Sequence, residues 1–259
     1  MSHSVSHSVT HGRPATAQGT PSGMGDGVQY ATIDDFADFG VRAVITTRAA
    51  GTFSLTGDDP TGDVMTRWQA LRSWLGAEGP GSRFATSLQV HGARVIWHEP
   101  GWEGWLRVDA ADGHCSVQRG TGLGISVADC VPVFVAHPSG IVGMLHAGWR
   151  GTAGQILPAA LAAMAERGAS AKETRIHLGP GICGACYEVG PDVYEQLTGR
   201  RASAPASVDL RAVLAGQARE CGVRSVTISP WCTRCDNAMF FSHRCGDSGR
   251  QVAALVATP

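Results

Sequence analysis

Three short segments of the sequence each carry one side chain that could bind a metal ion. They are Gln89-Val90-His91-Gly92, Ala128-Asp129-Cys130-Val131-Pro132 and His146-Ala147-Gly148-Trp149-Arg150-Gly151. Each ligand stands at the end of an apolar run, beside a glycine or proline bend. Two imidazoles and one thiolate make three protein ligands, which leaves one position of a zinc ion open for water or substrate. Because the segments are too far apart for a zinc finger, they predict a site assembled from separate strands.

Each of these three side chains also has a purely structural explanation, since buried thiols and hydrogen-bonded core histidines are common. Copper is the other metal that the ligand set could hold. A blue-copper centre uses two histidines and a cysteine with a weak axial methionine, and Met144 would share a strand face with His146. A multicopper oxidase also needs clustered His-x-His pairs, and no two of the 10 histidines are two positions apart. We therefore expect zinc, with copper as an adventitious occupant.

A second cysteine pattern lies further along the chain. Cys183-x-x-Cys186 and Cys232-x-x-Cys235 have the spacing of a four-cysteine zinc site. An incidental Cys183 is the alternative, and the sequence leaves a second metal site open. With 8 cysteines in 259 residues, the chain is too large to need disulfide staples, and its N-terminus lacks a secretory pattern. We expect reduced thiols in a cytoplasmic protein.

The composition excludes several classes of protein. The net charge is −1, so no basic surplus points to nucleic acid, and no apolar run reaches membrane-spanning length. Lys172 is the sole lysine and lies in Ala171-Lys172-Glu173, which is no phosphate-binding Walker loop. Schiff-base chemistry would depend on that same lysine, in a polar stretch between elements. We expect neither a nucleic-acid partner nor a membrane partner.

The elements that must position these residues alternate between short apolar strands and amphipathic helices, which is typical of an α/β protein. Strands are expected over residues 41–47, 84–90, 95–97, 124–127, 131–136, 141–145 and 175–178, and near Val226 and Val252. Helices are expected over 64–75 and 209–221, and over an apolar stripe that Thr152 would cap and Gly168 would end. Pro158 should kink that last helix or mark its first turn. Residues 124–127, 131–136 and 141–145 are continuously apolar, which predicts strands buried on both faces.

Residues 1–28 are rich in Ser, His, Thr, Gly and Pro, and repeat Ser-His-Ser-Val. Such a composition cannot bury enough apolar surface to offset the entropy of ordering, so we predict a disordered tail that is dispensable for stability and turnover. No linker-like stretch interrupts the remainder. Residues 29–259 are therefore expected to form a single catalytic domain.

From about Val41 to Ala257 the sequence resembles the YfiH-type family, whose members are described as multicopper polyphenol oxidoreductases, laccase-domain proteins, peptidoglycan editing factors and purine nucleoside phosphorylases. The three segments quoted first carry most of the likeness. Further matches are Leu178-Gly179-Pro180-Gly181, Cys186-Tyr187-Glu188-Val189-Gly190 and Phe240-Phe241-Ser242-His243-Arg244. The stretch over residues 49–59 departs from the family pattern, so the resemblance does not indicate substrate contacts in that part of the chain.

The resemblance implies a four-layer α/β/β/α sandwich with mixed sheets, in which His91, Cys130 and His146 bind zinc and form the catalytic centre. It further implies cleavage of adenosine, inosine and guanosine by phosphate, with methylthioadenosine as an additional substrate and adenosine deaminase as a side activity. The family also shares Asp112, an acidic position of unassigned role. Purine nucleosides and inorganic phosphate are thus the expected partners, while the sequence does not indicate an oligomeric state.

Arg48, Arg150 and Arg244 lie at expected element ends within family-like segments. Phosphate needs planar, bidentate donors, and with one lysine in the chain arginine must supply them. A surface ion pair is the alternative for each. Two other functions stay open: a copper-dependent, laccase-like phenol oxidase, and an editing factor or cysteine hydrolase for peptidoglycan precursors, with Cys130 as nucleophile.

Overall fold

Residues 29–259 are described by the computed structural model, so the predicted tail lies outside the described residues. One six-stranded sheet, here called sheet A, begins at the Tyr30 strand and ends at the Trp105 strand. In spatial order its strands are β1 (Tyr30–Thr32), β2 (Val41–Thr46), β14 (Gln251–Ala257), β7 (Thr121–Val127), β3 (Arg83–Ser87) and β5 (Gly104–Val108). The strand β14 pairs antiparallel with both neighbours, whereas β3 is parallel to both of its neighbours. Sheet A is therefore mixed.

A second six-stranded sheet, sheet B, is also mixed. In spatial order its strands are β13 (Ser225–Ile228), β10 (Arg175–Leu178), β8 (Val131–Ala136), β9 (Val142–Ala147), β6 (Gly113–Ser116) and β4 (Val95–His98). The pairs β10–β13 and β4–β6 are parallel, and the other three pairs are antiparallel. A small hairpin of β11 (Glu188–Val189) and β12 (Ala206–Ser207) stands apart from both sheets.

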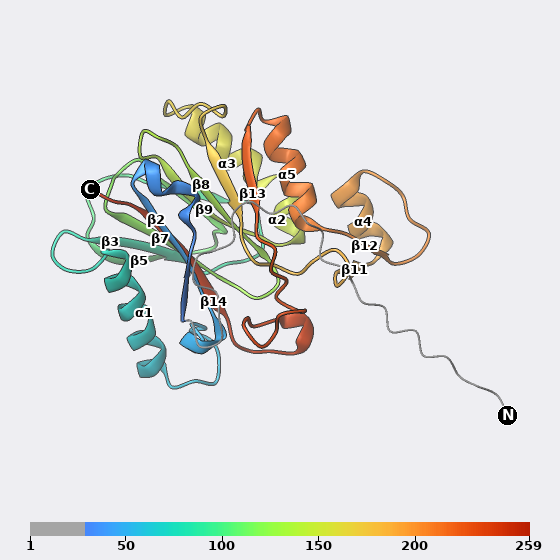
Figure 1. The fold of residues 1–259 in the computed structure, drawn as a ribbon, viewed down its shortest axis with the longest axis horizontal. Helices are drawn as coiled ribbons and strands as arrows, with labels where there is room; N and C mark the ends of the chain where they lie inside the picture. Colours follow the sequence, from blue (N-terminus) through green and yellow to red (C-terminus); the bar gives the residue numbers. More distant parts are fainter. Residues whose placement is uncertain (1–28) are drawn as a thin grey trace.

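The remaining elements are helical. They comprise the α-helices α1 (Thr61–Leu75), α2 (Trp149–Ala153), α3 (Ile156–Ala165), α4 (Pro191–Thr198) and α5 (Leu210–Glu220), and the 3-10 turns η1 (Asp34–Phe39), η2 (Arg48–Ala50) and η3 (His243–Cys245). In Figure 1, α1 lies on one side of the two sheets while α2, α3 and α5 lie on the other. The α4 region projects from the body beside the small hairpin. None of the described helices is long and apolar enough to cross a bilayer.

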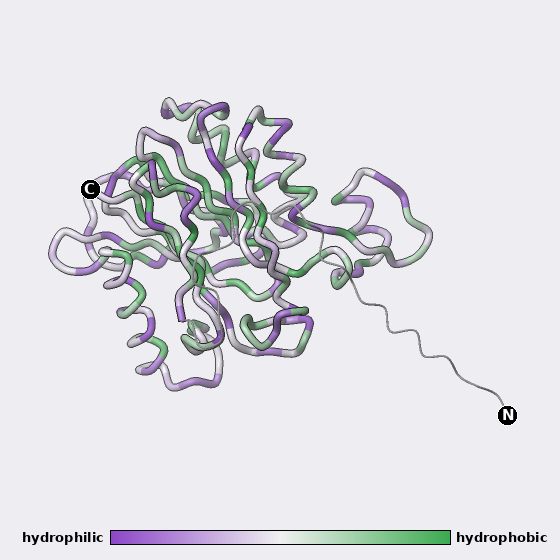
Figure 2. The backbone as a smooth tube through the Cα atoms, in the orientation of Figure 1, coloured by the Kyte–Doolittle hydropathy of each residue, from purple (hydrophilic) through white to green (hydrophobic). Residues whose placement is uncertain are grey.

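Three apolar clusters separate four layers of structure. Trp68 and Leu71 of α1 pack on one face of sheet A. The other face of sheet A packs on sheet B through residues such as Ile125 and Phe134. The outer face of sheet B packs on α3 and α5. The hydrophobic segments in Figure 2 run mainly along these strands and helix faces, so the expected α/β/β/α sandwich is confirmed.

Strands β8 and β9 show how the sequence produces this arrangement. Every residue in both strands is buried, as their continuous apolar pattern predicts. Successive side chains point to opposite faces of a strand. Accordingly Val133 and Leu145 belong to the helix-covered cluster, while Phe134 and Met144 belong to the cluster between the sheets.

The helix expected after Thr152 is in fact two helices. The first, α2, ends at Gly154, and Gln155 then takes a left-handed conformation with φ of 62°. The second, α3, places Pro158 in its first turn, where the missing N–H of proline costs no helical hydrogen bond. The alternative that Pro158 marks a first turn is therefore correct, and Thr152 lies within α2 rather than at a cap.

Candidate active site

His91, Cys130 and His146 meet at one end of the two sheets. His91 lies on the turn between β3 and β4, Cys130 immediately precedes β8, and His146 lies near the end of β9. The ligand atoms of the three side chains all lie within 4.8 Å of one another. His91 is exposed, Cys130 is partly buried and His146 is buried, so the cluster opens to solvent on one side. The convergence expected from three separate strand ends is present.

Asp112, which precedes β6, holds two of these segments together. Its fully buried carboxylate accepts hydrogen bonds from the backbone N–H groups of His91 and Gly92, at 2.9 and 2.7 Å, and from Val90 at 3.2 Å. It also lies 2.8 Å from Nδ1 of His146. Burial raises the pKa of Asp112, but these hydrogen bonds lower it by more than burial raises it. The pKa of the carboxyl is therefore below its ordinary value. An ionised carboxylate only accepts, so Nδ1 of His146 carries a proton and Nε2 is left for the cluster.

The backbone at the cluster is shaped to fit the three ligands. His91 has a positive φ of 59°, which the hydrogen bonds from its turn to Asp112 support. A Cβ atom at Gly148 would lie 2.9 Å from Sγ of Cys130 and 3.5 Å from Cδ2 of His91. A side chain at this position would therefore displace the Cys130 sulfur, while its Cβ would be in ordinary contact with the imidazole.

The three side chains also influence one another's protonation. Burial raises the pKa of Cys130, but the adjacent His146 and His91 outweigh this effect and lower it to about 6. Burial lowers the pKa of His146, and Cys130 and Asp112 together raise it to about 9. The cluster thus favours a thiolate, the form of cysteine that binds metals and attacks electrophiles.

A cavity of about 780 Å³ opens over the cluster. All three cluster residues line it, together with Arg150 and Arg244. The guanidinium of Arg150 lies 4.4 Å from the ring centre of Trp149, and that of Arg244 lies 5.2 Å from the ring centre of Tyr187. The cavity therefore combines a metal-type ligand set, exposed arginines and aromatic faces on which a planar base could stack.

Arg48 occupies a different position from the other two arginines. It does not line this cavity. Its guanidinium forms an ion pair with Asp247 at 2.5 Å and donates to the carbonyl oxygens of Asn237 and Phe240. Arg48 therefore binds the loop that carries Arg244, and its guanidinium does not face the cavity in this structure.

Sequence reasoning missed several residues of the cavity wall. Gln89 and Ser126 line it and bind each other, since the Ser126 N–H donates to Oε1 of Gln89 and Nε2 of Gln89 donates to the Ser126 carbonyl, both at 2.8 Å. Tyr187 lines it as well. Gln89 and Tyr187 stand inside the quoted motifs, which was the available signal. Phe53 and Ser54 also line it, although they belong to the stretch that departs from the family pattern.

Comparison with known proteins gives the family of this chain. The family model described as "Multi-copper polyphenol oxidoreductase laccase" matches residues 43–258. A protein from Streptomyces coelicolor named purine nucleoside phosphorylase is 36% identical over 208 residues, which cover 77% of this chain and 84% of that protein. A protein from an unknown prokaryotic organism named adenosine deaminase is 37% identical over 140 residues, which cover 49% of this chain and 53% of that protein. The crystal structure of the hypothetical protein YfiH from Bacillus licheniformis has the same fold, with a TM-score of 0.80 and 22% identity over 88% of this chain and 96% of that one.

Proposed function

This chain belongs to the multi-copper polyphenol oxidoreductase laccase family, also called the YfiH family, and we propose that it is a zinc-dependent purine nucleoside phosphorylase. The observation that carries the proposal is a single cavity that joins the His-Cys-His cluster to exposed arginines, among them Arg150 and Arg244. A relative that is 36% identical to this chain over 208 residues bears the name of that activity. Proposed substrates are adenosine, inosine and guanosine with inorganic phosphate.

The residues present fit a zinc ion. Two neutral imidazoles and one thiolate are a catalytic zinc ligand set, and Asp112 orients His146 as carboxylates commonly orient metal-binding histidines. The bare α-carbon of Gly148 leaves room beside the cysteine sulfur. When bound, zinc would act as a Lewis acid toward a substrate oxygen or nitrogen. We assign His91, Cys130 and His146 as its ligands.

Copper fits less well than zinc. Met144, the candidate axial ligand, lies fully buried in the core between the two sheets and is not among the residues that line the cavity. Among the described residues, the other group that could hold a metal consists of four cysteines and no histidine. A multicopper oxidase would need further histidines close by.

The proposed reaction exchanges one bond at the anomeric carbon of the nucleoside. A phosphate oxygen forms the new C1′–O bond, and the C1′–N9 bond breaks through an oxocarbenium-like state. The electron pair of the broken bond leaves with the purine, which takes up a proton, so the products are the free base and ribose 1-phosphate. Arg150 and Arg244 would hold the phosphate dianion, and Trp149 and Tyr187 offer faces for the base.

The decisive experiment supplies adenosine or inosine to the purified protein with and without inorganic phosphate. We expect free base and ribose 1-phosphate in equal amounts, and almost no base when phosphate is omitted. Arg150→Met and Arg244→Met should each raise the KM for phosphate, whereas Arg201→Met, at a side chain that is 92% exposed, should not. Base release that ignores phosphate would make the protein a hydrolase. Oxygen uptake with phenols and several coppers per chain would make it an oxidase.

Adenosine deamination is a second candidate activity of the same cavity, supported by the relative named adenosine deaminase. Deamination replaces the amino group at C6 of adenine by oxygen from water and releases ammonia. If one cavity supports both reactions, inosine should inhibit ammonia release from adenosine competitively. The Cys130→Ser variant should lose both activities together, and survival of either one alone would contradict a shared cavity.

A further inference from the structure

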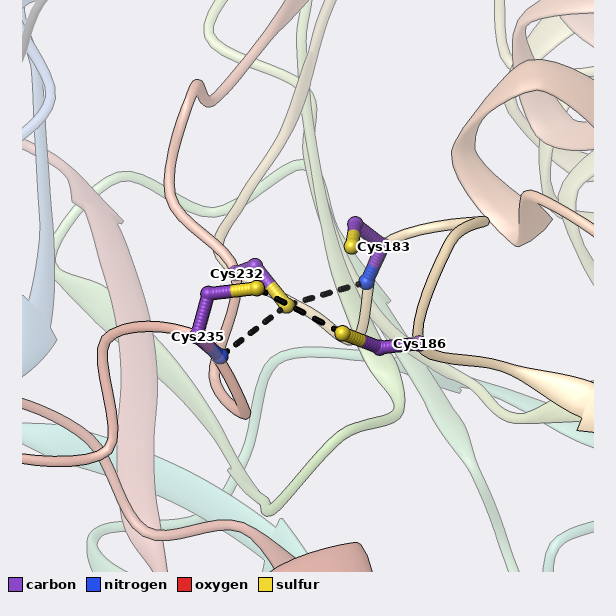
Figure 3. Close-up of side chains that lie close together, drawn as sticks. All are labelled: Cys183, Cys186, Cys232 and Cys235. Atoms are coloured by element: carbon purple, nitrogen blue, oxygen red, sulfur yellow. Dashed lines mark hydrogen bonds between the residues drawn. The ribbon is translucent and has the colours of Figure 1, made fainter. Parts of the chain in front are cut away.

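Four cysteines form a second cluster outside the cavity wall. The sulfur atoms of Cys183, Cys186, Cys232 and Cys235 all lie within 4.8 Å of one another. Figure 3 shows the four side chains converging from two separate loops. Within residues 29–259 this is the one group of candidate metal ligands besides the His-Cys-His cluster. The proposed activity makes no use of it.

The fold explains why the two cysteine pairs meet. Cys183 and Cys186 lie on the loop that leaves β10, and Cys232 and Cys235 lie on the loop that leaves β13. Because β10 and β13 are parallel neighbours in sheet B, both loops leave the sheet at the same end. A backbone bridge between Gly181 and Cys232 continues the pairing into the loops. Each Cys-x-x-Cys turn therefore faces the other across one short gap.

The geometry of the cluster suits tetrahedral metal coordination. Sulfur atoms bound to zinc at 2.3 Å in a tetrahedron lie about 3.8 Å apart. The sulfur atoms of Cys186 and Cys235 are 3.4 Å apart, and no pair among the four exceeds 4.8 Å. A disulfide would require about 2.05 Å. The described cysteines are all free thiols.

Backbone groups around the cluster favour a thiolate at Cys232. The N–H of Cys183 points to Sγ of Cys232 at 3.2 Å, and the N–H of Cys235 points to the same sulfur at 3.4 Å. Both contacts are drawn in Figure 3. Four thiolates on one zinc ion leave a net charge of about −2. Arg234, between the two cysteines of its turn, places a cation next to that charge and donates to the carbonyl of Cys186.

We propose that Cys183, Cys186, Cys232 and Cys235 bind a structural zinc ion that fastens the two loops together. With four protein ligands the site has no open position, which distinguishes it from the site at Cys130. The fastened loops carry parts of the cavity wall. Tyr187 directly follows Cys186, and the hydroxyl of Thr233 donates to Asp129, beside Cys130, at 2.6 Å.

This zinc is thus a positioning element for the cavity. The Asp129 carboxylate that receives Thr233 also accepts the N–H of Arg244 at 2.7 Å. Arg244 in turn lies over the ring of Tyr187. Loss of the ion would release both loops at once, so the cavity wall around Tyr187 and Arg244 would loosen while the His-Cys-His cluster keeps its own ligands.

The test measures zinc per chain by elemental analysis in the full-length protein purified without chelators. We expect Cys183→Ser/Cys232→Ser to contain about one zinc per chain less than wild type and to melt at a lower temperature. The matched controls are Cys221→Ser and Cys245→Ser, at thiols outside both clusters, which should keep all of the metal. The His91→Ala variant, which tests the other site, should lose its zinc independently of the four cysteines. Failure of the proposed activity is therefore distinguishable from failure of this site.

A second measurement uses only wild type, in case the double variant does not fold. Cys235 and Cys245 are both exposed, so iodoacetamide can reach a free thiol at either position. Bound zinc should protect Cys235 while Cys245 is alkylated, and a strong chelator should remove that protection. Equal labelling of the two thiols would overturn the proposal. So would protection removed by a reductant alone, which indicates a disulfide, or one iron per chain at the four cysteines in place of zinc.

Discussion

At the scale of single residues, Asp112 connects the most parts of the site. One buried carboxylate binds the turn at His91 and the ring of His146, so it sets the relative position of two proposed ligands. An Asp112→Asn change would replace one acceptor oxygen by an NH₂ group that faces N–H donors. We expect metal affinity at the His-Cys-His site to fall by about 10- to 100-fold, as is usual when such a carboxylate is removed. A competition titration with a chromogenic chelator measures it, and an unchanged affinity would show that Asp112 only supports the turn.

Cys130 can be a metal ligand or a covalent nucleophile, and serine separates the two roles. A hydroxyl is a poor zinc ligand, so Cys130→Ser should lose about one zinc per chain together with turnover. Cys130→Asp should keep part of the metal, because a carboxylate also binds zinc. Retention of all zinc in Cys130→Ser, with a covalent adduct trapped on wild type alone, would identify a nucleophile instead.

At the scale of elements, the sequence predicts best where one physical effect dominates. Strands β8 and β9 are apolar throughout and buried throughout, and the helix expected over 209–221 is present as α5, with Asp209 at its N-cap. Strand β6 was missed because Gly-His-Cys-Ser carries no apolar alternation, and its polar side chains are buried only through partners on other strands. Strand β5 was missed because it is a half-exposed edge strand.

The same reasoning applies to the candidate site. His91, Cys130 and His146 could be singled out from their motifs, since each motif contains its own bend, and the structure brings the three side chains together. The ion pair of Arg48 could not be predicted, because its partner Asp247 is about 200 residues away in sequence and nothing local indicates the contact. The link between Asp112 and His146 is likewise visible only once β6 is placed beside β9.

The ion pair between Arg48 and Asp247 holds the loop that carries His243 and Arg244. If Arg48 acts through the loop, then Arg48→Met and Asp247→Asn should raise the KM for phosphate to a similar degree, on the order of 5-fold, with little change in kcat. The double variant should be no worse than either single variant, because both remove one interaction of about 1 kcal/mol. Steady-state kinetics at varied phosphate decide the matter. A large effect of Arg48→Met with none from Asp247→Asn would mean that Arg48 contacts phosphate directly.

In the whole molecule, side-chain hydrogen bonds link the two layers of strands near two opposite edges of their interface. Near β1, the carboxylate of Asp35 on η1 lies 2.7 Å from Nδ1 of His177 on β10. Near β3, Nε2 of His114 on β6 lies 3.1 Å from the hydroxyl of Ser87. The sheets are stacked with their strand orders running the same way, so these two contacts mark opposite edges of the interface. Between them the interface is apolar.

The hydrogen bonds that link His98, His114 and Ser87 define the protonation state of both rings. The Ser87 hydroxyl donates to the carbonyl of Ala111 at 2.6 Å, so its oxygen accepts from Nε2–H of His114. Nδ1 of His114 then accepts from Nε2–H of His98 at 2.9 Å. Both rings satisfy this chain when they are neutral. Burial lowers the pKa of His98 to about 4, and burial followed by the nearby His98 lowers that of His114 to about 3.

Acid should therefore destabilise the whole molecule through this pair. The folded-state pKa values lie below the ordinary value of 6.5, so as pH falls through 6.5 the unfolded chain takes up protons that the folded chain does not. The free energy of unfolding is unaffected by the pair above pH 6.5 and falls between pH 6.5 and about 4, with a slope of up to about 1.4 kcal/mol per pH unit for each ring.

Urea unfolding at pH 7, 6 and 5 should show a smaller loss for His114→Gln than for wild type, by about 1 to 2 kcal/mol over that range. Parallel pH profiles for wild type and His114→Gln would mean that the pair does not stay neutral in the folded protein, and that its acid sensitivity arises at another group.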